Sequence, residues 1–360
     1  MIGDYLEEFP VRDYTTDTDR TLDIAVIGLG DFALTQAIPA ITSTQRCTFS
    51  VAVSGTPATA EQVVENHGVT VLNYDEYRDG VATDEYDAVY ICTPNSLHLD
   101  HGRIATSHGK DILCEKPLEA TVERARQLVE RCDTAGVTLM VAYRMHFEPA
   151  VYRAKEALQE GVVGDVAQVY GANTERLSKT FSDDDHWRLD PDLSGYGSSV
   201  MDIGIYPINT TRYLLEQDPI RVTSVMHSNN EAFADVPDER SMFTLVWEND
   251  VQSVFTTSLN AYKDSQLKIT GTEGRINFEP AFQRWCDMII EREGTAGEFT
   301  LSLDERFTEL VNEFEYFADC ILSGESVYAD GKHALKDMCI LRAIYRAAQT
   351  DETIEISYEI

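Results

Sequence analysis

The feature that most constrains this 360-residue chain is a glycine turn near its start, Gly28-Leu29-Gly30-Asp31-Phe32-Ala33. It follows an apolar run at residues 22–28 that is typical of a strand, and it opens a stretch of helical periodicity at residues 31–44. In a strand–turn–helix of the form G-x-G-x-x-A, the first glycine permits the tight turn and the second lets the backbone approach a pyrophosphate. The small third residue packs the helix on the strand, and the helix N-terminus supplies N–H donors. The turn therefore predicts a dinucleotide site.

The rest of the first 145 residues repeats this alternation of strand and helix. The predicted strands are 22–28, 48–54, 69–73, 87–93, 111–114 and 137–143, and the predicted helices are 31–44, 58–67, 96–109 and 121–136. Strands that alternate with helices of this length form parallel βαβ units. We expect an N-terminal Rossmann domain, a doubly wound parallel sheet over residues 21–145, behind an acidic extension at residues 1–20.

The rhythm changes after residue 145. A helix at 149–161 precedes longer strands at 166–174, 220–228, 240–247, 251–259, 266–270, 275–278 and 285–292, with tight turns at 247–251 and 271–274. Helices follow at 303–323 and 332–350. Consecutive strands joined by tight turns favour an antiparallel sheet. We therefore expect an α+β domain over residues 146–360 with a large, mainly antiparallel sheet, whose terminal helix either stays there or packs back on the Rossmann domain.

Charge excludes several classes of partner. The chain has 29 basic and 62 acidic residues, a formal net charge of −33, spread over its length. Such a surface repels nucleic acid and anionic lipid, and it repels itself unless salt screens it. No apolar run reaches the length of a membrane span. We expect a cytoplasmic protein from a high-salt cytosol, with no nucleic-acid partner, no membrane partner and no metal. The seven cysteines contain no CxxC pair, so reduced thiols are expected.

The end of the second strand bears on the choice of cofactor. It carries Ser54-Gly55-Thr56 and no carboxylate. Sites that prefer NAD usually place Asp or Glu there to accept from the ribose 2′-hydroxyl. NADP is therefore favoured over NAD, although no arginine or lysine follows nearby to neutralise a 2′-phosphate.

Further motifs identify a family. Thr93-Pro94-Asn95, with His98, ends one predicted strand, and Glu115-Lys116-Pro117 ends the next. Downstream stand Trp187-Arg188 and a helical segment with Asp202, Tyr206 and Asn209. In this order the motifs resemble the Gfo/Idh/MocA family, typified by glucose–fructose oxidoreductase and inositol dehydrogenase, from residue 22 to the end. With the acidity, the resemblance implies an NADP-dependent sugar dehydrogenase that oxidises an aldose at its anomeric carbon, with D-xylose to D-xylonolactone as the leading reaction.

The resemblance also assigns the cofactor residues. Besides residues 28–33 and 54–56, it implies contacts from a set drawn from the later motifs: Thr93, Pro94, Asn95, His98, Glu115, Lys116, Arg144, Trp187 and Arg188. Two of these have alternatives. His98 is equally consistent with a capping or packing residue, and Arg188 with an ion-pair partner for the acidic run at 183–185. A metal at residues 183–186 is the weaker interpretation of that run. The resemblance further implies a cis Lys116–Pro117 bond.

The chemistry needs a base for the sugar hydroxyl. Lys116 follows a buried strand at the sheet edge where ligands bind, and partial desolvation there lowers a lysine's pKa. Asp202 and Tyr206 are four residues apart, so they share a helix face. We expect Tyr206 to be the acid/base, Lys116 to orient the sugar and favour the phenolate, and Asp202 to support them; the reverse, with Lys116 as base, remains open. Asn209 is a candidate for binding a substrate hydroxyl.

Other functions stay open at this point. They are a dehydrogenase of another sugar or polyol such as glucose or myo-inositol, a dehydrogenase of a trans-dihydrodiol, a dinucleotide sensor without turnover, and an enzyme whose tightly bound cofactor shuttles between two sugars, for which the segment before residue 22 is short. A sensor needs no proton acceptor beside the nicotinamide, so Lys116 with Tyr206 argues against it. In this family the solvent-facing sheet of the second domain often forms the subunit interface, and residues 251–259 suit such a surface. A homodimer or homotetramer through that sheet is expected.

Overall fold

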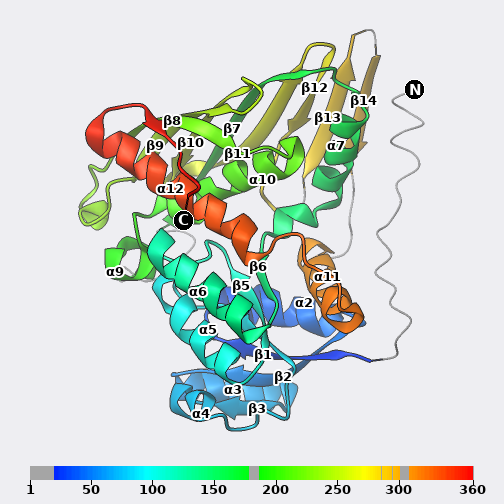
Figure 1. Ribbon diagram of the computed structural model, residues 1–360, viewed down its shortest axis with the longest axis vertical. Coiled ribbons are helices and arrows are strands. Elements are labelled where there is room, and N and C mark those ends of the chain that lie inside the picture. Colours follow the sequence, from blue (N-terminus) through cyan, green and yellow to red (C-terminus); the bar gives the residue numbers. More distant parts are fainter. Residues whose placement is uncertain (1–19, 178–185, 285, 294, 301–307, 360) are drawn as a thin grey trace. The chain divides into compact units, whose positions relative to one another are not determined.

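A computed structural model of the protein describes residues 20–177, 186–284, 286–293, 295–300 and 308–359 (Figure 1). These residues divide into two compact units. One contains residues 20–144 and 308–335, and the other contains residues 145–300 and 336–359. The sequence placed the first boundary after residue 145, and it assigned residues 308–335 to the second domain.

The first unit is built on a parallel sheet of six strands. They are β1 (Leu22–Ile27), β2 (Cys47–Val53), β3 (Thr70–Leu72), β4 (Ala88–Ile91), β5 (Asp111–Glu115) and β6 (Leu139–Ala142). The strand order is β3-β2-β1-β4-β5-β6, and every pairing is parallel. The predicted doubly wound sheet is confirmed. Because the order reverses between β1 and β4, their carboxyl ends border the crevice where such sheets bind ligands.

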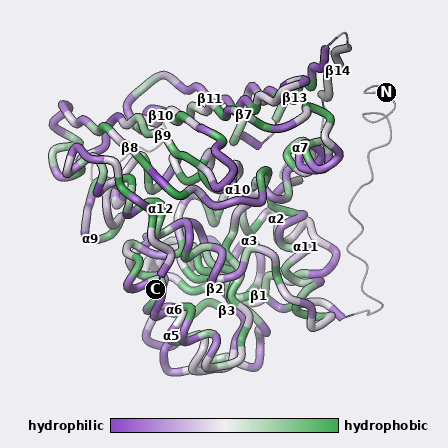
Figure 2. Tube along the Cα trace, turned by 45° about the horizontal axis from the view of Figure 1, so that its top comes forward, coloured by the Kyte–Doolittle hydropathy of each residue, from purple (hydrophilic) through white to green (hydrophobic). Residues whose placement is uncertain are grey.

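Helices connect these strands. They are η1 (Ala33–Ala37) with α2 (Ile38–Ser43), α3 (Pro57–His67), α4 (Tyr74–Arg78), η2 (Asn95–Leu97) with α5 (His98–Ser107), and α6 (Val122–Ala135). The boundaries of α6 follow from its sequence: Thr121 Oγ1 accepts a hydrogen bond from Arg124 N, and Gly136 ends the helix in a left-handed conformation. α11 (Thr308–Ser323) packs against α2, β1 and β2 of this unit. Figure 2 shows hydrophobic residues along β1 and β2.

The second unit is built on a sheet of nine strands. They are β7 (Val166–Arg176), β8 (Pro219–His227), β9 (Arg240–Trp247), β10 (Gln252–Ser258), β11 (Asn260–Gly271), β12 (Gly274–Phe278), β13 (Asp287–Arg292), β14 (Thr295–Thr300) and β15 (Ile354–Glu355). The order is β14-β13-β12-β11-β7-β10-β9-β8-β15, and among the described strands of this sheet only β7 and β10 pair in parallel. The expected mainly antiparallel sheet is confirmed, with β14 and β15 added to it.

One face of this sheet carries helices. They are α7 (Pro149–Gln159), η5 (Val200–Gly204) with α10 (Ile205–Leu215), and the part of α12 (Gly331–Thr350) that belongs to this unit, from residue 336 on; the short α9 (Pro191–Ser194) precedes η5 (Figure 1). Alternate residues of β9, namely Phe243, Leu245 and Trp247, are buried, while Met242 on the other face is exposed. The helix predicted at 303–323 begins at Thr308, and residues 303–307 lie outside the described residues. No described helix has the length and apolar character needed to cross a membrane.

Candidate active site

The glycine turn lies at the switch point of the parallel sheet. Gly28 has φ +93°, and a Cβ there would lie 2.6 Å from the carbonyl oxygen of Cys92 and 2.7 Å from Cγ2 of Thr93. Only glycine fits such a position. At Gly30 a Cβ would meet no protein atom within 4 Å, so the backbone faces open space. Ala33 is fully buried and starts the π-helical turn η1, a geometry that is common at functional sites.

The end of β4 supplies an observation that fits a bound ligand. Thr93 is largely buried, and its hydroxyl has no hydrogen-bond partner among the described residues. Its methyl group is the neighbour of Gly28 described above. A buried hydroxyl without a partner costs free energy unless a ligand or water completes it. Thr93, which lies next to Gly28 of the glycine turn, therefore suits the sugar–phosphate part of a dinucleotide. Asn95, from the same motif, is buried.

His98 connects two loops at this edge. Its Nδ1 lies 3.1 Å from the carbonyl oxygen of Leu118, and its Nε2 lies 2.9 Å from that of Thr93. The side chain is fully buried. His98 thus links the Thr93 loop to the loop after Lys116, which fits the packing role, and its contact with the cofactor stays a prediction.

The end of β2 is compact. Ser54 Oγ accepts a hydrogen bond of 3.1 Å from Thr56 N, whereas the residues Gly55 and Thr56 are exposed. A Cβ on Gly55 would lie 3.1 Å from the ring of Tyr74, which stacks on His101 with ring centroids 5.2 Å apart. Burial lowers the pKa of His101 to about 4. The sequence analysis missed this aromatic pair, whose only signal was a tyrosine after a short strand.

Glu115 and Lys116 end β5. Tyr90 donates a hydrogen bond of 2.5 Å to Glu115 Oε1, and the backbone N–H of Lys116 donates one of 3.2 Å to Glu115 Oε2. Burial, reinforced by Cys92 and Glu115, raises the pKa of Tyr90 well above its usual value, so it is a donor at neutral pH. The Lys116–Pro117 bond is cis, as the family resemblance implied. Both side chains are half-buried.

Arg144 follows β6 and forms an ion pair with a buried glutamate of the same unit. Its Nη1 lies 3.3 Å from Glu309 Oε1, and the two side chains are 14% and 1% exposed. Glu313, one turn further along α11, is fully buried, and burial raises the pKa of its carboxyl well above the usual value. Sequence reasoning found Arg144 but not its acidic partners, because they come from a helix far along the chain.

In the second unit, Asp202 lies in η5 and Tyr206 in the first turn of α10. Arg188 Nε donates a hydrogen bond of 2.5 Å to Asp202 Oδ2, and its guanidinium lies 4.5 Å from the ring centre of Trp187. A ring nitrogen of His186 lies 3.2 Å from Arg188 Nη1. Arg188 therefore forms an ion pair with Asp202. The acidic run at 183–185 lies outside the described residues, so a pair of Arg188 with that run, like its contact with the cofactor, stays a prediction.

Asn209 lies near the middle of α10. Asn209 is buried, and its amide nitrogen donates a hydrogen bond of 2.8 Å to Asp337 Oδ2. Arg212 donates to the other oxygen of Asp337, also at 2.8 Å, and to Asp218. These contacts fix α10 to α12, so the structure favours a structural role for Asn209, and its contact with substrate stays a prediction. Tyr206 is half-buried, with its ring centre 6.2 Å from that of Phe282.

Among the residues that the structure describes, no group of three or more histidine, cysteine, aspartate or glutamate side chains could hold a metal ion. The acidic run next to His186 lies outside them. The seven cysteines are free thiols, and six of them are buried.

Comparison with known proteins gives the same assignment for both units. Residues 22–143 match the oxidoreductase family with an NAD-binding Rossmann fold, GFO/IDH/MocA, and residues 151–277 match the GFO/IDH/MocA C-terminal domain. The chain is 44% identical over 354 residues to a D-xylose 1-dehydrogenase [NADP(+)] of Haloarcula marismortui, covering 97% of each. It is 30% identical to D-xylose 1-dehydrogenase (NADP(+)) 2 of Haloferax volcanii, covering 92% of this chain and 98% of that one. A crystal structure of aldose-aldose oxidoreductase from Caulobacter crescentus superposes with a TM-score of 0.87 at 27% identity, covering 93% of this chain and 100% of that one.

Proposed function

This chain belongs to the GFO/IDH/MocA family of oxidoreductases, and on that premise we propose that it oxidises D-xylose to D-xylonolactone with NADP. The proposal of D-xylose as the substrate rests on the 44% identity to the Haloarcula marismortui enzyme over 97% of both chains. The parallel sheet supports the proposal that NADP binds here, because the open backbone at Gly30 and the unpartnered hydroxyl of Thr93 border the switch point of the sheet.

Three side chains take part in the proposed mechanism. NADP bound at the glycine turn would supply the acceptor for the hydride of the anomeric carbon. Tyr206 takes the proton of the anomeric hydroxyl, and Lys116 orients that hydroxyl and favours the phenolate form by its charge. Asp202, held by Arg188, keeps a fixed negative charge on the segment that precedes Tyr206. If the roles are reversed, Lys116 is the base and Tyr206 the orienting donor.

The test of the reaction is a panel of pentoses, hexoses, polyols and a trans-dihydrodiol, assayed with NADP and NAD in molar salt. D-xylose with NADP should give the highest kcat/KM. Tyr206→Phe and Lys116→Ala should each lower kcat at least about a hundredfold. Tyr262→Phe is the matched control, because that tyrosine is 86% exposed, and it should retain the wild-type rate. Activity near wild type in Tyr206→Phe would remove it from the mechanism, and a purified protein that reduces no coenzyme with any compound would favour the sensor.

The preference for NADP is proposed to depend on the end of β2. Thr56 is exposed there and no carboxylate is present, so nothing repels a 2′-phosphate. Thr56→Asp would place a negative charge beside that phosphate, and at this exposed position the repulsion should raise KM for NADP by about tenfold. KM for NAD should change little. An equal effect on both coenzymes would place the 2′-phosphate elsewhere.

We also propose that the protein works in a high-salt cytoplasm. Its net charge of −33 implies self-repulsion that only screening relieves. Thermal denaturation should therefore show a falling Tm as KCl is lowered from about 3 M to about 0.05 M, where the Debye length grows severalfold. An unchanged Tm over this range would contradict the proposal.

The open face of the nine-stranded sheet is proposed to bind a second copy of the chain. Tyr170, Val225 and Met242 are 40%, 60% and 53% exposed there, and Val225 pairs directly with Met242 across β8 and β9. Apolar side chains gathered on one face of a sheet mark an interaction surface. The variant V225E/M242E should shift the mass in multi-angle light scattering to that of a monomer. Val81→Glu, at a residue 45% exposed in the other unit, should leave the mass unchanged.

A further inference from the structure

A fully buried carboxylate meets the start of the helical segment that carries Asp202 and Tyr206. Asp238 lies in the connection between β8 and β9, after η6 (Glu231–Phe233), and is 0% exposed. Its Oδ1 accepts a hydrogen bond of 2.7 Å from the backbone N–H of Ser198, and its Oδ2 accepts one of 2.8 Å from that of Val200. The carboxylate therefore spans the residues from which η5 begins.

Hydroxyl groups complete the surroundings of this carboxylate. Tyr345, from α12, donates a hydrogen bond of 2.6 Å to Asp238 Oδ2. Ser199 Oγ donates to the backbone carbonyl of Asp238 at 2.5 Å and lies 3.3 Å from Oδ2. In the part of the chain that the structure describes, Asp238 forms no ion pair. A buried negative charge held only by N–H and O–H donors requires all of them, since each lost donor leaves the charge less compensated.

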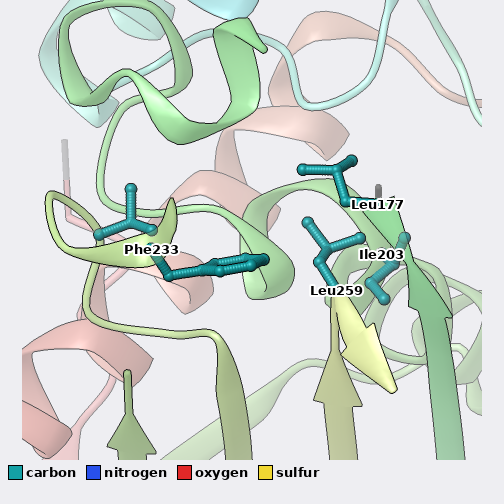
Figure 3. Close-up of a cluster of buried hydrophobic side chains, with 5 residues drawn as sticks. Leu177, Ile203, Phe233 and Leu259 are labelled. Atoms are coloured by element: carbon teal, nitrogen blue, oxygen red, sulfur yellow. The ribbon is translucent and has the colours of Figure 1, made fainter. Parts of the chain in front are cut away.

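The same loop also holds η5 through apolar contacts. Ile203, the residue after Asp202, belongs to a buried cluster with Phe233 and Val236, both from the β8–β9 connection, and with Leu177 and Leu259. Figure 3 shows the Phe233 ring extending toward Leu259 and Ile203. The β8–β9 connection therefore contacts η5 in two ways, through this apolar cluster and through the carboxylate of Asp238.

Two further contacts show how closely this turn is fixed. Asn173 of β7 donates a hydrogen bond of 3.0 Å to the carbonyl oxygen of Ile203. A Cβ on Gly197 would lie 2.5 Å from Asp238 Oδ1 and 2.5 Å from the ring of Tyr345, so the chain entering η5 passes directly over the carboxylate. The first N–H groups of a helix have no partner within it, and a carboxylate there also meets the positive end of the helix dipole.

From this arrangement we infer that Asp238 is a positioning residue for the acid/base pair: by accepting from Ser198 and Val200 it sets where the π-helical turn starts, and therefore how Asp202 and Tyr206 are presented to substrate. The inference rests on the proposed function, which gives those two residues their chemistry. It assigns Asp238 no contact with sugar or coenzyme. Small displacements of catalytic groups lower the rate of the chemical step far more than they weaken binding of a distant ligand.

The chain offers a matched control in the next residue. Glu239 is also buried, and its Oε2 accepts hydrogen bonds of 2.7 and 2.8 Å from the backbone N–H groups of Asn229 and Asn230. Like Asp238 it is a buried carboxylate in the β8–β9 connection, but its other oxygen pairs with Arg240 at 3.0 Å and accepts from Asn260 at 2.9 Å, and none of these partners is in η5. Asp238→Asn and Glu239→Gln each replace one acceptor oxygen by an amide nitrogen that cannot accept from the facing donors.

The experiment compares both variants with the wild type in molar salt by thermal denaturation and steady-state kinetics. Asp238→Asn should lower kcat with D-xylose at least tenfold while KM for NADP stays within twofold. Glu239→Gln should lose a similar amount of Tm and keep kcat within twofold. Equal kcat in the two variants, or a loss in Asp238→Asn confined to KM for NADP, would overturn the inference.

Two more variants keep the outcome interpretable. If Asp238→Asn does not fold, Tyr345→Phe removes a single donor from the same carboxylate and should lower kcat about threefold to tenfold, with KM for NADP unchanged; a wild-type kcat would overturn the inference. Tyr206→Phe tests the premise in the same preparation. Full activity in Tyr206→Phe refutes the proposed acid/base, whereas an inactive Tyr206→Phe together with a fully active Asp238→Asn refutes only the positioning role.

Discussion

Gly28→Ala should lower the free energy of unfolding far more than Gly30→Ala, the corresponding substitution two residues along the glycine turn. Gly28 has φ +93°, where L-residues are strained, and the new Cβ would stand 2.6 Å from the carbonyl oxygen of Cys92. That oxygen belongs to the backbone at the end of β4, next to β1 in the sheet, so it cannot rotate away as a side chain would. The methyl group must therefore push β1 and β4 apart at their carboxyl ends.

The magnitude follows from two costs. Placing alanine in a left-handed conformation costs about 1–2 kcal/mol. Forcing a methyl group into a packed interior costs about 1–3 kcal/mol more, through shifts of the backbone around it. Together they give a loss of about 2–5 kcal/mol, which corresponds to a fall in Tm on the order of 5–20 °C for a unit of this size.

Gly30→Ala is the control, two residues away. Its Cβ would meet no protein atom within 4 Å, so the Tm of this variant should stay within about 2 °C of the wild type. If a pyrophosphate approaches that backbone, the same methyl group should raise the Kd for NADPH at least tenfold, measured by the change in its fluorescence on titration. Two results would refute the reasoning: a wild-type Tm for Gly28→Ala, or wild-type NADPH affinity for Gly30→Ala.

Two other substitutions test electrostatic contacts of the structure. Arg188→Ala removes the partner 2.5 Å from Asp202, where the two side chains are only 17% and 10% exposed, and should cost about 1–3 kcal/mol of stability in thermal denaturation and lower kcat; equal Tm and kcat would show that the pair does not hold Asp202. Glu313→Gln tests the buried carboxyl of Glu313, whose pKa is raised by burial well above 4.5. Above pH 4.5 the unfolded chain releases this proton while the folded state keeps it, so the stability of the wild type should fall as the pH rises. The glutamine variant should lack this loss and exceed the wild-type Tm at pH 8 but not at pH 4, and parallel Tm–pH curves would contradict the assignment.

Local sequence patterns predicted the parallel sheet and the residues at its carboxyl edge. The glycine turn, the end of β2 and the Glu115-Lys116-Pro117 segment each lie within a few residues of a strand whose apolar run is visible in the sequence. The large antiparallel sheet was predicted in the same way. β15 has two residues and pairs with β8 from a distant part of the chain, so neither its composition nor its neighbours indicated a strand.

The long-range contacts around the candidate site residues could not be predicted, because the partners are distant in sequence. Asp238 meets Tyr345 across 107 residues, and Arg144 meets Glu309 across 165. An aspartate in a loop of an acidic chain has the same sequence appearance whether it is solvated or buried. Only packing distinguishes them, and packing depends on which elements become neighbours. The π-helical form of η5 is equally invisible, since its residues fit an ordinary helix.

The acidic residues of this chain affect its stability in two ways, which differ in their dependence on salt. Exposed carboxylates repel one another through solvent, where salt screens them over a few ångströms, but buried carboxylates are screened much less. Each buried carboxyl must be compensated within the protein, and the structure shows three solutions. Glu119 Oε1 lies 2.9 Å from Arg124 Nε, Asp238 is surrounded by N–H and O–H donors, and Glu313 has a pKa raised by burial so that it keeps its proton. Because these solutions do not depend on dissolved ions, the effects of Asp238→Asn and Glu313→Gln should persist at every salt concentration at which the fold survives.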